Sequence, residues 1–409
     1  MATETTRPAI VYFGNDWSAD NRTSSHHIAR WLSQKNRLYY VECPGMRPPR
    51  ASGRDLKKLL SKLWRGIRGA RPAGKNIQVR TLLQLPFHRF SLVRRLNRFL
   101  IIASLRWSMW REGIRQPIAW FTVPHLSNAV GRLGQQLSVY YCTDDYSTFP
   151  DVDPVVVRAM DDELTRKADL VFATAETLQQ RKLPDNPNTY FSPHGVDVEF
   201  FGQAMDEKTA IPADTAHLQG PIVGFFGLFE EWIDLDLIDF LAEQRPHWTF
   251  LMIGRVAVPE AKLPKRPNVH FVGKRPYETL PAYGKQFDAA IIPFKLTEVI
   301  LHANPLKLRE YLAMGKPIVS VSTPEIDKYA DVVEVAESRD EFLARLDAVL
   351  SRAPLPSETR RRLDRVAAES WDSRIGQVLE LVEQHLAEKN RALTEARDSR
   401  SISLAGERR

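Results

Sequence analysis

Residues 302–320 read HANPLKLREYLAMGKPIVS, the pattern of a short helix that leads into a buried strand. We expect Asn304 to cap this helix, and Pro305 suits the first turn because its missing N–H would have no partner there. Gly315 can adopt the left-handed conformation that ends a helix, and residues 318–321 continue as an apolar strand. The apolar side chains that can pack the helix are Leu306, Leu308, Leu312 and Met314.

Lys307 and Glu310 lie one turn apart near the start of this helix. Packing does not require a charged residue at either position. The simplest interpretation is an exposed ion pair on a solvated face, which would contribute less than about 1 kcal/mol. The alternative is that the two charges belong to a binding site, and the rest of the chain has to decide between these interpretations.

The composition is typical of a soluble globular protein, with 43% hydrophobic and 26% charged residues in a chain of 409. This length exceeds one ordinary hydrophobic core, so we expect two domains. Cys43 and Cys142 are far apart and predict neither a disulfide framework nor a metal site. No signal-peptide pattern and no run of about 18 apolar residues is evident. We therefore expect a cytoplasmic location, including the inner face of the cell membrane.

Apolar strands and helical patterns alternate along the chain in two series. The strands of the first series are expected at residues 9–14, 38–43, 118–123, 139–142, 170–173 and 190–191, with helices at 24–34, 91–112 and 154–167. The strands of the second are expected at 222–226, 249–253, 269–272, 289–293 and 318–321, with helices at 235–244, 276–285 and 305–314. This alternation predicts an α/β fold of two doubly wound domains with parallel sheets.

A polar stretch at residues 198–218 is interpreted as the linker between the two series. We place the domains at 1–205 and 206–370, followed by a closing helix at 371–390 and a disordered tail at 391–409. Ligands of such folds bind at the carboxyl ends of the strands, so the site is expected in the cleft between the domains.

Several strand-to-helix junctions of the second series open at the same edge of its sheet. Gly227 follows one strand, where backbone N–H groups could approach a phosphate, and Arg255 stands at the tip of the next strand. A plain turn would explain Gly227 equally well. A nucleotide diphosphate would need cations for its phosphates and a carboxylate for its ribose hydroxyls, and Lys307 and Glu310 offer both.

The stretch 304–320 resembles the nucleotide-sugar motif of GT-B glycosyltransferases related to family 4. Three further segments and their order are similar to that family: RKADLVFATAETL (166–178), SPHGVDVEFF (192–201) and NVHFVGKRPYETLPAYGKQFDAAIIPF (268–294). The resemblance covers about residues 9–370. Within the family, the chain is most similar to bacterial transferases that assemble surface polysaccharides, including teichuronic-acid-type enzymes.

The resemblance implies the GT-B fold, in which two Rossmann-like domains face each other across a cleft. It implies a nucleotide-sugar donor, with UDP as the expected nucleotide, and no metal or other cofactor. It also implies that Glu310 holds the donor ribose and that Arg255 lies near the diphosphate. The remaining donor-site residues that it implies are Gly227, Asn304, Pro305, Leu306 and Lys307.

Two departures from the family pattern leave the donor sugar and the stereochemistry open. The family has a glutamate that contacts the donor sugar eight positions before Glu310, and this chain has His302 there. The basic residue that usually follows the Gly227 strand is replaced by the sequence EEW at residues 230–232.

Candidate catalytic residues follow strands of the first series. Asp144 and Asp145 come after strand 139–142, and one of them could take the proton of an acceptor hydroxyl in an inverting transfer. In a retaining transfer, stabilisation of the leaving phosphate would suffice. His125 is a further candidate at this edge, and weaker ones are Asp16, His26 and His27. The alternatives are turn or capping chemistry for the aspartates and a structural role for His125.

Positive charge is concentrated between residues 46 and 116, which carry 18 Lys and Arg against two acids. This block carries a net charge of +16. Because the whole chain carries +7, the remainder carries −9. Residues 54–75 and 88–111 mix cations with large apolar residues at near-helical spacing, which predicts contact with an anionic membrane surface through residues 54–111. The alternative is an apolar face turned to the core with solvated cations.

We therefore expect a hexosyl- or glucuronosyltransferase that acts on a polyprenyl-diphosphate-linked saccharide in the synthesis of exopolysaccharide or another surface polysaccharide. The alternatives are a nucleotide-sugar epimerase or hydrolase on the same fold, an inactive binding relative, and a nucleic-acid-binding protein suggested by the basic composition. A nucleic acid is not expected as the partner, because the cations interleave with large apolar residues.

Overall fold

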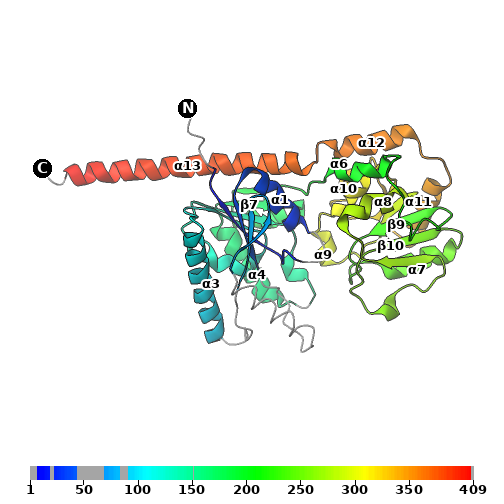
Figure 1. The fold of residues 1–409 in the computed structure, drawn as a ribbon, viewed down its shortest axis with the longest axis horizontal. Helices are drawn as coiled ribbons and strands as arrows, with labels where there is room; N and C mark the ends of the chain where they lie inside the picture. Colours follow the sequence, from blue (N-terminus) through cyan, green and yellow to red (C-terminus); the bar gives the residue numbers. More distant parts are fainter. Residues whose placement is uncertain (1–6, 19–22, 44–68, 83–90, 151, 407–409) are drawn as a thin grey trace.

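The computed structural model describes residues 7–18, 23–43, 69–82, 91–150 and 152–406, which form two α/β domains side by side (Figure 1). The first domain contains an eight-stranded sheet in the order β3-β4-β2-β1-β5-β6-β7-β8. The second contains a six-stranded sheet in the order β11-β10-β9-β12-β13-β14. The predicted pair of doubly wound domains is confirmed.

The first sheet is parallel except for its edge strand β3, which runs antiparallel to β4. Its strands are β1 (Ile10–Gly14), β2 (Leu38–Glu42), β3 (Arg71–Gly74), β4 (Ile77–Thr81), β5 (Ile118–Phe121), β6 (Leu137–Cys142), β7 (Leu170–Ala173) and β8 (Thr189–Phe191). The short helices η1 (Pro124–Ala129) and η2 (Tyr146–Thr148) follow β5 and β6. One face is covered by α3 (Ser91–Arg111), α4 (Pro154–Lys167) and α5 (Glu176–Lys182), and the other by α1 (Ser24–Lys35) and the start of α13 (Trp371–Gly406). Burial on both faces explains why the central strands are continuous apolar runs.

All strand pairs of the second sheet are parallel. Its strands are β9 (Ile222–Phe226), β10 (Thr249–Ile253), β11 (Val269–Gly273), β12 (Ala289–Ile292), β13 (Ile318–Val321) and β14 (Glu334–Ala336). One face packs on α6 (Val198–Gly202), α8 (Leu280–Lys285), α10 (Leu306–Ala313) and α12 (Pro356–Ala367). The other face packs on α7 (Leu235–Gln244) and α11 (Arg339–Leu350), and the short α9 (Glu298–Leu301) precedes α10. The chain order changes direction between β9 and β12, so the carboxyl ends of these strands mark the expected ligand edge.

The last helix, α13 (Trp371–Gly406), returns to the first domain and runs across it (Figure 1). Trp371, Ile375 and Val378 are buried in the same core as the strands of the first sheet. The prediction of a disordered tail from residue 391 is wrong as far as Gly406, because helix α13 continues to that residue.

Two other expectations are corrected. The helical interpretation of residues 54–75 is wrong at its end, because Arg71–Gly74 is a strand paired with β4; the part before Gly69 lies outside the described residues. Pairing with the sheet outweighs the helical spacing there. The expected linker begins instead with helix α6, whose Phe201 is buried in the second domain. Within the described ranges, we find no helix with the length and apolar character needed to cross a membrane.

Candidate functional site

The ends of β9 and β10 meet at two glycines. The Gly227 N–H donates to the Ile253 carbonyl over 2.8 Å, and the Gly254 N–H donates to the Gly273 carbonyl over 2.9 Å. Gly254 has a φ of +143°, and a Cβ atom on it would lie 1.7 Å from the Gly227 carbonyl oxygen. A side chain at position 254 is therefore excluded, and the two loops touch at the ligand edge of the sheet.

Helix α10 brings Lys307 to the same place. A Cβ atom on Gly227 would lie 3.4 Å from Lys307 Cε, which shows how close this side chain is to the end of β9. Lys307 Nζ lies 3.1 Å from Glu310 Oε2 and 5.3 Å from the centre of the Phe226 ring. Glu310 is buried and Lys307 is half-buried, so the solvated-face interpretation of this pair is wrong.

Arg255 is exposed at the tip of β10. Its backbone carbonyl accepts a hydrogen bond from the Phe229 N–H over 3.0 Å, which fixes the loop. Its guanidinium has no hydrogen-bond or ion-pair partner within the described part of the chain. The edge therefore presents one unpaired cation at Arg255, a second cation and a carboxylate at Lys307 and Glu310, and a glycine turn.

Asn304 does not cap helix α10, contrary to the prediction. Pro305 occupies the capping position, and the buried Asn304 amide donates to Glu325 Oε2 over 2.9 Å. Its side-chain oxygen accepts from Arg309 Nη1 over 2.6 Å. Two partners from tertiary structure therefore outweigh the local capping preference, and Asn304 anchors the start of the helix.

Arg309, a residue of helix α10, is almost fully buried. It donates to Glu369 Oε2 and to the Tyr329 hydroxyl, each over 2.7 Å. Burial alone would raise the pKa of Glu369, but the Arg309 charge and the Tyr329 hydrogen bond outweigh it and lower this pKa. The only sequence signal of this network is the charged Arg309 among the leucines of residues 306–312, and it did not predict the partners.

Glu325 joins this network to the first domain. Its Oε1 accepts from the Glu176 N–H, at the start of α5, over 2.9 Å and from Lys328 Nζ over 2.8 Å. Lys328 also lies 3.0 Å from Glu176 Oε1. The start of α10 is thus tied to the first domain through a single buried carboxylate.

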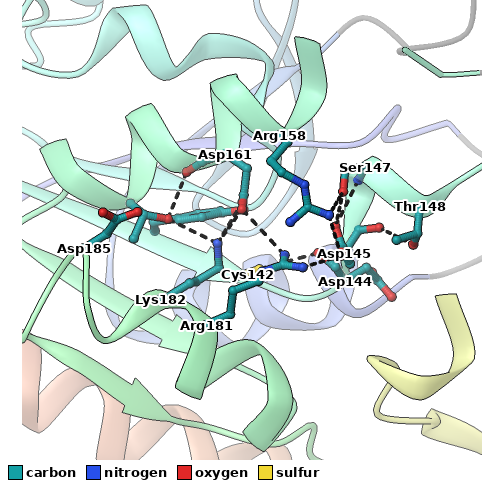
Figure 2. A network of polar contacts seen from close by, with 12 residues as sticks. Cys142, Asp144, Asp145, Ser147, Thr148, Arg158, Asp161, Arg181, Lys182 and Asp185 are labelled. Carbon is teal, nitrogen blue, oxygen red and sulfur yellow. Dashed lines mark hydrogen bonds and ion pairs between the residues drawn. The ribbon is translucent and has the colours of Figure 1, made fainter. Parts of the chain in front are cut away.

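The two candidate aspartates of the first domain differ in their surroundings. Asp145 is buried and accepts from the Ser147 hydroxyl over 2.6 Å and from Arg181, with Arg158 at 3.6 Å (Figure 2). Burial opposes its ionisation, but the Arg181 and Ser147 hydrogen bonds and both arginine charges lower its pKa to about 2. With this lowered pKa, Asp145 is a weak proton acceptor near neutral pH, and its role as the base stays a prediction. Its carboxylate caps η2.

Asp144 points away from this cluster, toward the side on which a segment of the second domain lies (Figure 2). Burial raises its pKa from 3.8 to about 7, an effect that the Asp145 charge adds to and the Thr143 hydrogen bond opposes. A carboxylate with this pKa at the edge of the sheet can take a proton near neutral pH.

The polar cluster behind Asp145 continues into the core. Lys182 Nζ lies 2.7 Å from Asp161 Oδ2, and the Tyr140 hydroxyl donates to the same aspartate. Helices α4 and α5 are thereby fixed against β6, the strand that leads into Asp144 (Figure 2). Arg181 contacts both Asp145 and Asp161, and its guanidinium lies 3.8 Å from Asp161 Oδ2.

The three candidate histidines at the sheet edge also differ in their surroundings. Both ring nitrogens of His125 are buried without a hydrogen-bond partner within the described residues, and burial lowers its pKa to about 4. His26 is structural, since its ring contacts the Thr23 N–H at 3.1 Å and the Asp16 carbonyl at 3.1 Å. His27 stacks on Trp371 with ring centres 5.4 Å apart. His125 alone of the three keeps its ring nitrogens unpartnered.

Comparison with known proteins agrees with this geometry. Residues 220–352 match the family described as Glycosyl transferases group 1. The chain is 25% identical over 406 residues to TuaH of Bacillus subtilis (strain 168), named for a glycosyltransferase of teichuronic acid biosynthesis, with 91% of this chain and 97% of TuaH covered.

Solved structures share the fold of the whole chain. Sucrose-phosphate synthase from Thermosynechococcus elongatus aligns with a TM-score of 0.67 at 14% identity, covering 93% of this chain and 100% of that one. Anabaena HepE in complex with UDP and glucose aligns with a TM-score of 0.63 at 14% identity, covering 92% and 99%. The chain is a glycosyltransferase of the GT-B type. The predicted GT-B fold and the family resemblance are both confirmed.

The domains of this glycosyltransferase meet near His302, the residue that follows α9. Burial lowers the pKa of His302, and the charges acting on it include Asp145 and Arg181 of the first domain. The rings of Phe149 and Trp232, one from each domain, have centres 6.4 Å apart. The segment before α10 therefore faces the loop that carries Asp144. Within the described ranges, no group of His, Cys, Asp and Glu could hold a metal ion.

Proposed function

We propose that this glycosyltransferase transfers a sugar from a UDP-sugar donor to a polyprenyl-diphosphate-linked saccharide, with release of UDP, during synthesis of a bacterial surface polysaccharide. The observation that carries the proposal is the grouping of Gly227, Arg255, Lys307 and Glu310 at the carboxyl ends of β9 and β10. The UDP bound to HepE, which shares the fold, supports the nucleotide. The name of TuaH supports the pathway class, and we propose a hexosyl or a glucuronosyl group as the one transferred.

The donor would bind with its diphosphate between Arg255 and Lys307 and its ribose hydroxyls on Glu310. Asn304, Pro305 and Leu306 would lie beside the phosphates, where the start of a helix favours negative charge. Lys307 would then exchange its pairing with Glu310 for the phosphate, and the leaving UDP would be stabilised by both cations. No metal ion or other cofactor is required in this scheme.

The acceptor hydroxyl would approach from the first domain. In an inverting transfer Asp144 would take its proton, and the neutral ring of His125 would bind a substrate hydroxyl through one of its unpartnered nitrogens. In a retaining transfer, stabilisation of the leaving phosphate by Lys307 and Arg255 would carry the reaction, and Asp144 would orient the acceptor.

A lipid-linked acceptor would place the reaction at the cytoplasmic face of the cell membrane, with the basic region of residues 54–111 toward the lipid. This placement accounts for the uneven charge of the chain, which is +16 in residues 46–116 and −9 elsewhere.

The donor site is tested by the melting temperature of the protein with UDP, GDP or ADP, for the wild type and for Glu310→Ala. A ligand at 100 times its dissociation constant adds about 2.7 kcal/mol, which corresponds to a shift of a few degrees. We expect UDP to shift the wild type and not the variant. Glu380→Ala, an exposed change on α13, is the matched control and should keep the shift.

A wild type that no nucleotide shifts would contradict the proposal. Consumption of a UDP-sugar without any acceptor would favour the alternative of an epimerase or hydrolase. Tight, steeply salt-dependent binding to any duplex, unchanged in Glu310→Ala, would favour a nucleic-acid-binding protein.

A further inference from the structure

Helix α3 carries a second apolar face that the fold leaves exposed. Its inner face packs on the first sheet through Ile101, Leu105 and Met109. On the outer face, Phe99 is 69% exposed, Trp107 53% and Trp110 73%. Figure 1 shows α3 at the outer edge of the first domain, on the side away from the second domain. The exposed large apolar residues, here called the α3 stripe, are Leu96, Phe99, Leu100, Trp107 and Trp110.

The α3 stripe is continuous along the helix. At 3.6 residues per turn, its five side chains fall within a sector of about 100°, opposite the buried face. Arg106 and Arg111 are exposed and flank this sector, one on each side. The guanidinium carbon of Arg111 lies 5.0 Å from the centre of the Trp107 ring. Cations bordering exposed tryptophans are typical of a helix that lies in the interface of a bilayer.

The charge of the helix argues for a lipid surface over a second copy of the chain. The sequence of α3 contains five arginines and no acidic residue. A two-fold dimer through this face would bring the same cationic patch against itself. An anionic bilayer offers the opposite charge over the whole face and an apolar layer for the rings beneath it.

We infer that the α3 stripe docks this glycosyltransferase onto an anionic lipid bilayer. Trp107 and Trp110 enter the interfacial layer, and Arg106 and Arg111 lie against the phosphates of the headgroups. The inference rests on the proposed function in one respect, since a lipid-linked acceptor requires the enzyme at a membrane. The inference assigns the membrane contact predicted for residues 54–111 to helix α3. The apolar residues of this helix face the core on one side and the lipid on the other.

The test is cosedimentation of the full chain with vesicles of phosphatidylcholine alone or mixed with phosphatidylglycerol. We expect binding to the anionic vesicles, weakened by about tenfold or more in Trp107→Ala/Trp110→Ala. Arg106→Gln/Arg111→Gln should weaken it too and reduce its dependence on salt. Ile211→Ala/Leu355→Ala removes exposed apolar residues of the second domain and is the matched control, with binding unchanged. Far-ultraviolet circular dichroism checks that each variant is folded.

Absence of binding to anionic vesicles, or equal binding by the wild type and the tryptophan variant, would overturn the inference. So would a wild-type dimer that the tryptophan variant dissociates, because the face would then belong to a second copy. The UDP-induced melting shift is read on the same proteins. It involves no residue of α3, so a wild type that shifts with UDP but does not bind anionic vesicles refutes the docking and leaves the donor site standing.

Discussion

Asp144 and Asp145 are neighbours in the chain, and their carboxyl groups have opposite electrostatic surroundings. Arg181 and Arg158 face Asp145 and lower its pKa to about 2, whereas the half-buried Asp144 lies away from these cations and desolvation raises its pKa to about 7. One carboxylate therefore stabilises the ionised cluster, and its neighbour remains able to exchange a proton near neutral pH.

Replacing Asp144 by Asn should stabilise the protein above pH 7. Between pH 3.8 and about 7, the folded chain holds a proton on Asp144 that the unfolded chain has lost. Stability therefore falls as pH rises through this interval, and the full penalty is present above it. We expect the free energy of unfolding of Asp144→Asn at pH 8 to exceed that of the wild type by about 1–2 kcal/mol, since partial exposure reduces the effect.

Urea unfolding of both proteins at pH 8 and pH 4 measures this difference, which should vanish at the lower pH. A variant less stable than the wild type at pH 8 would show that Asp144 is ionised and paired in the folded state. A donor-induced melting shift that stays unchanged would confirm that the substitution leaves the second domain intact.

Replacing Asp145 by Asn should have the opposite effect. The lowered pKa means that Asp145 adds stability above pH 3.8, and this contribution is lost as pH falls through about 2. Asp145→Asn leaves Arg158 without its carboxylate and Arg181 with only the longer contact to Asp161, so we expect a loss of about 2–4 kcal/mol at pH 7. Asp185→Asn removes an exposed carboxylate that lies 3.7 Å from Arg166 and serves as the control. It should change the free energy of unfolding by less than about 1 kcal/mol.

The sequence predicts the elements well where one local signal controls the structure. Strands such as β7 and β10 are buried on both faces, so their apolar runs are unmistakable, and helix α4 starts at Pro154 behind the capping Asp153. Strands β3 and β4 were missed, because β3 is a short edge strand whose place depends on pairing with β4.

The sequence predicted which residues come together at the candidate site, but it did not predict the hydrogen bonds and ion pairs that they make. Gly227, Lys307 and Glu310 come together because the chain order places their junctions at one sheet edge. Which of Asp144 and Asp145 remains free depends on Arg158 and Arg181, which lie 13 and 36 positions after Asp145. No local pattern carries that information, and the same holds for the exposed face of α3.

The two glycines at the donor edge should respond differently to alanine. In Gly254→Ala the new methyl would meet the Gly227 carbonyl at 1.7 Å, and φ is +143°, so we expect a loss of several kcal/mol. In Gly227→Ala the neighbours are the movable side chains of Phe225, at 2.9 Å, and Lys307, at 3.4 Å. This variant should lose about 1 kcal/mol of stability, because Phe225 has to move, and most of its UDP-induced shift, because the methyl would keep a phosphate away from the turn.

Thermal unfolding with and without UDP separates the two effects. Gly376→Ala is the control, since a Cβ atom there would have no neighbour within 4 Å, and it should be neutral or slightly stabilising. A Gly227→Ala protein that keeps the full UDP shift would place the phosphates elsewhere.

The last prediction concerns the hydrogen bond of 2.9 Å from Asn304 to Glu325. Asn304→Asp sets two buried carboxylates against each other, and we expect a loss of about 2–4 kcal/mol at pH 7. Glu325→Gln sets two amide groups against each other while Glu176 and Lys328 still require an acceptor, so it should cost about 1–3 kcal/mol.

The double variant Asn304→Asp/Glu325→Gln restores the bond with donor and acceptor exchanged. Arg309 still finds an oxygen at position 304, and Glu176 and Lys328 still find one at position 325, while the net charge of the pair is unchanged. The double variant should therefore lose less stability than the two single variants together. We expect this difference to be about 2 kcal/mol or more in a double-mutant cycle. Additive losses would mean that the contact does not hold the start of α10. Recovery of stability together with the UDP-induced shift would tie this buried pair to the donor site.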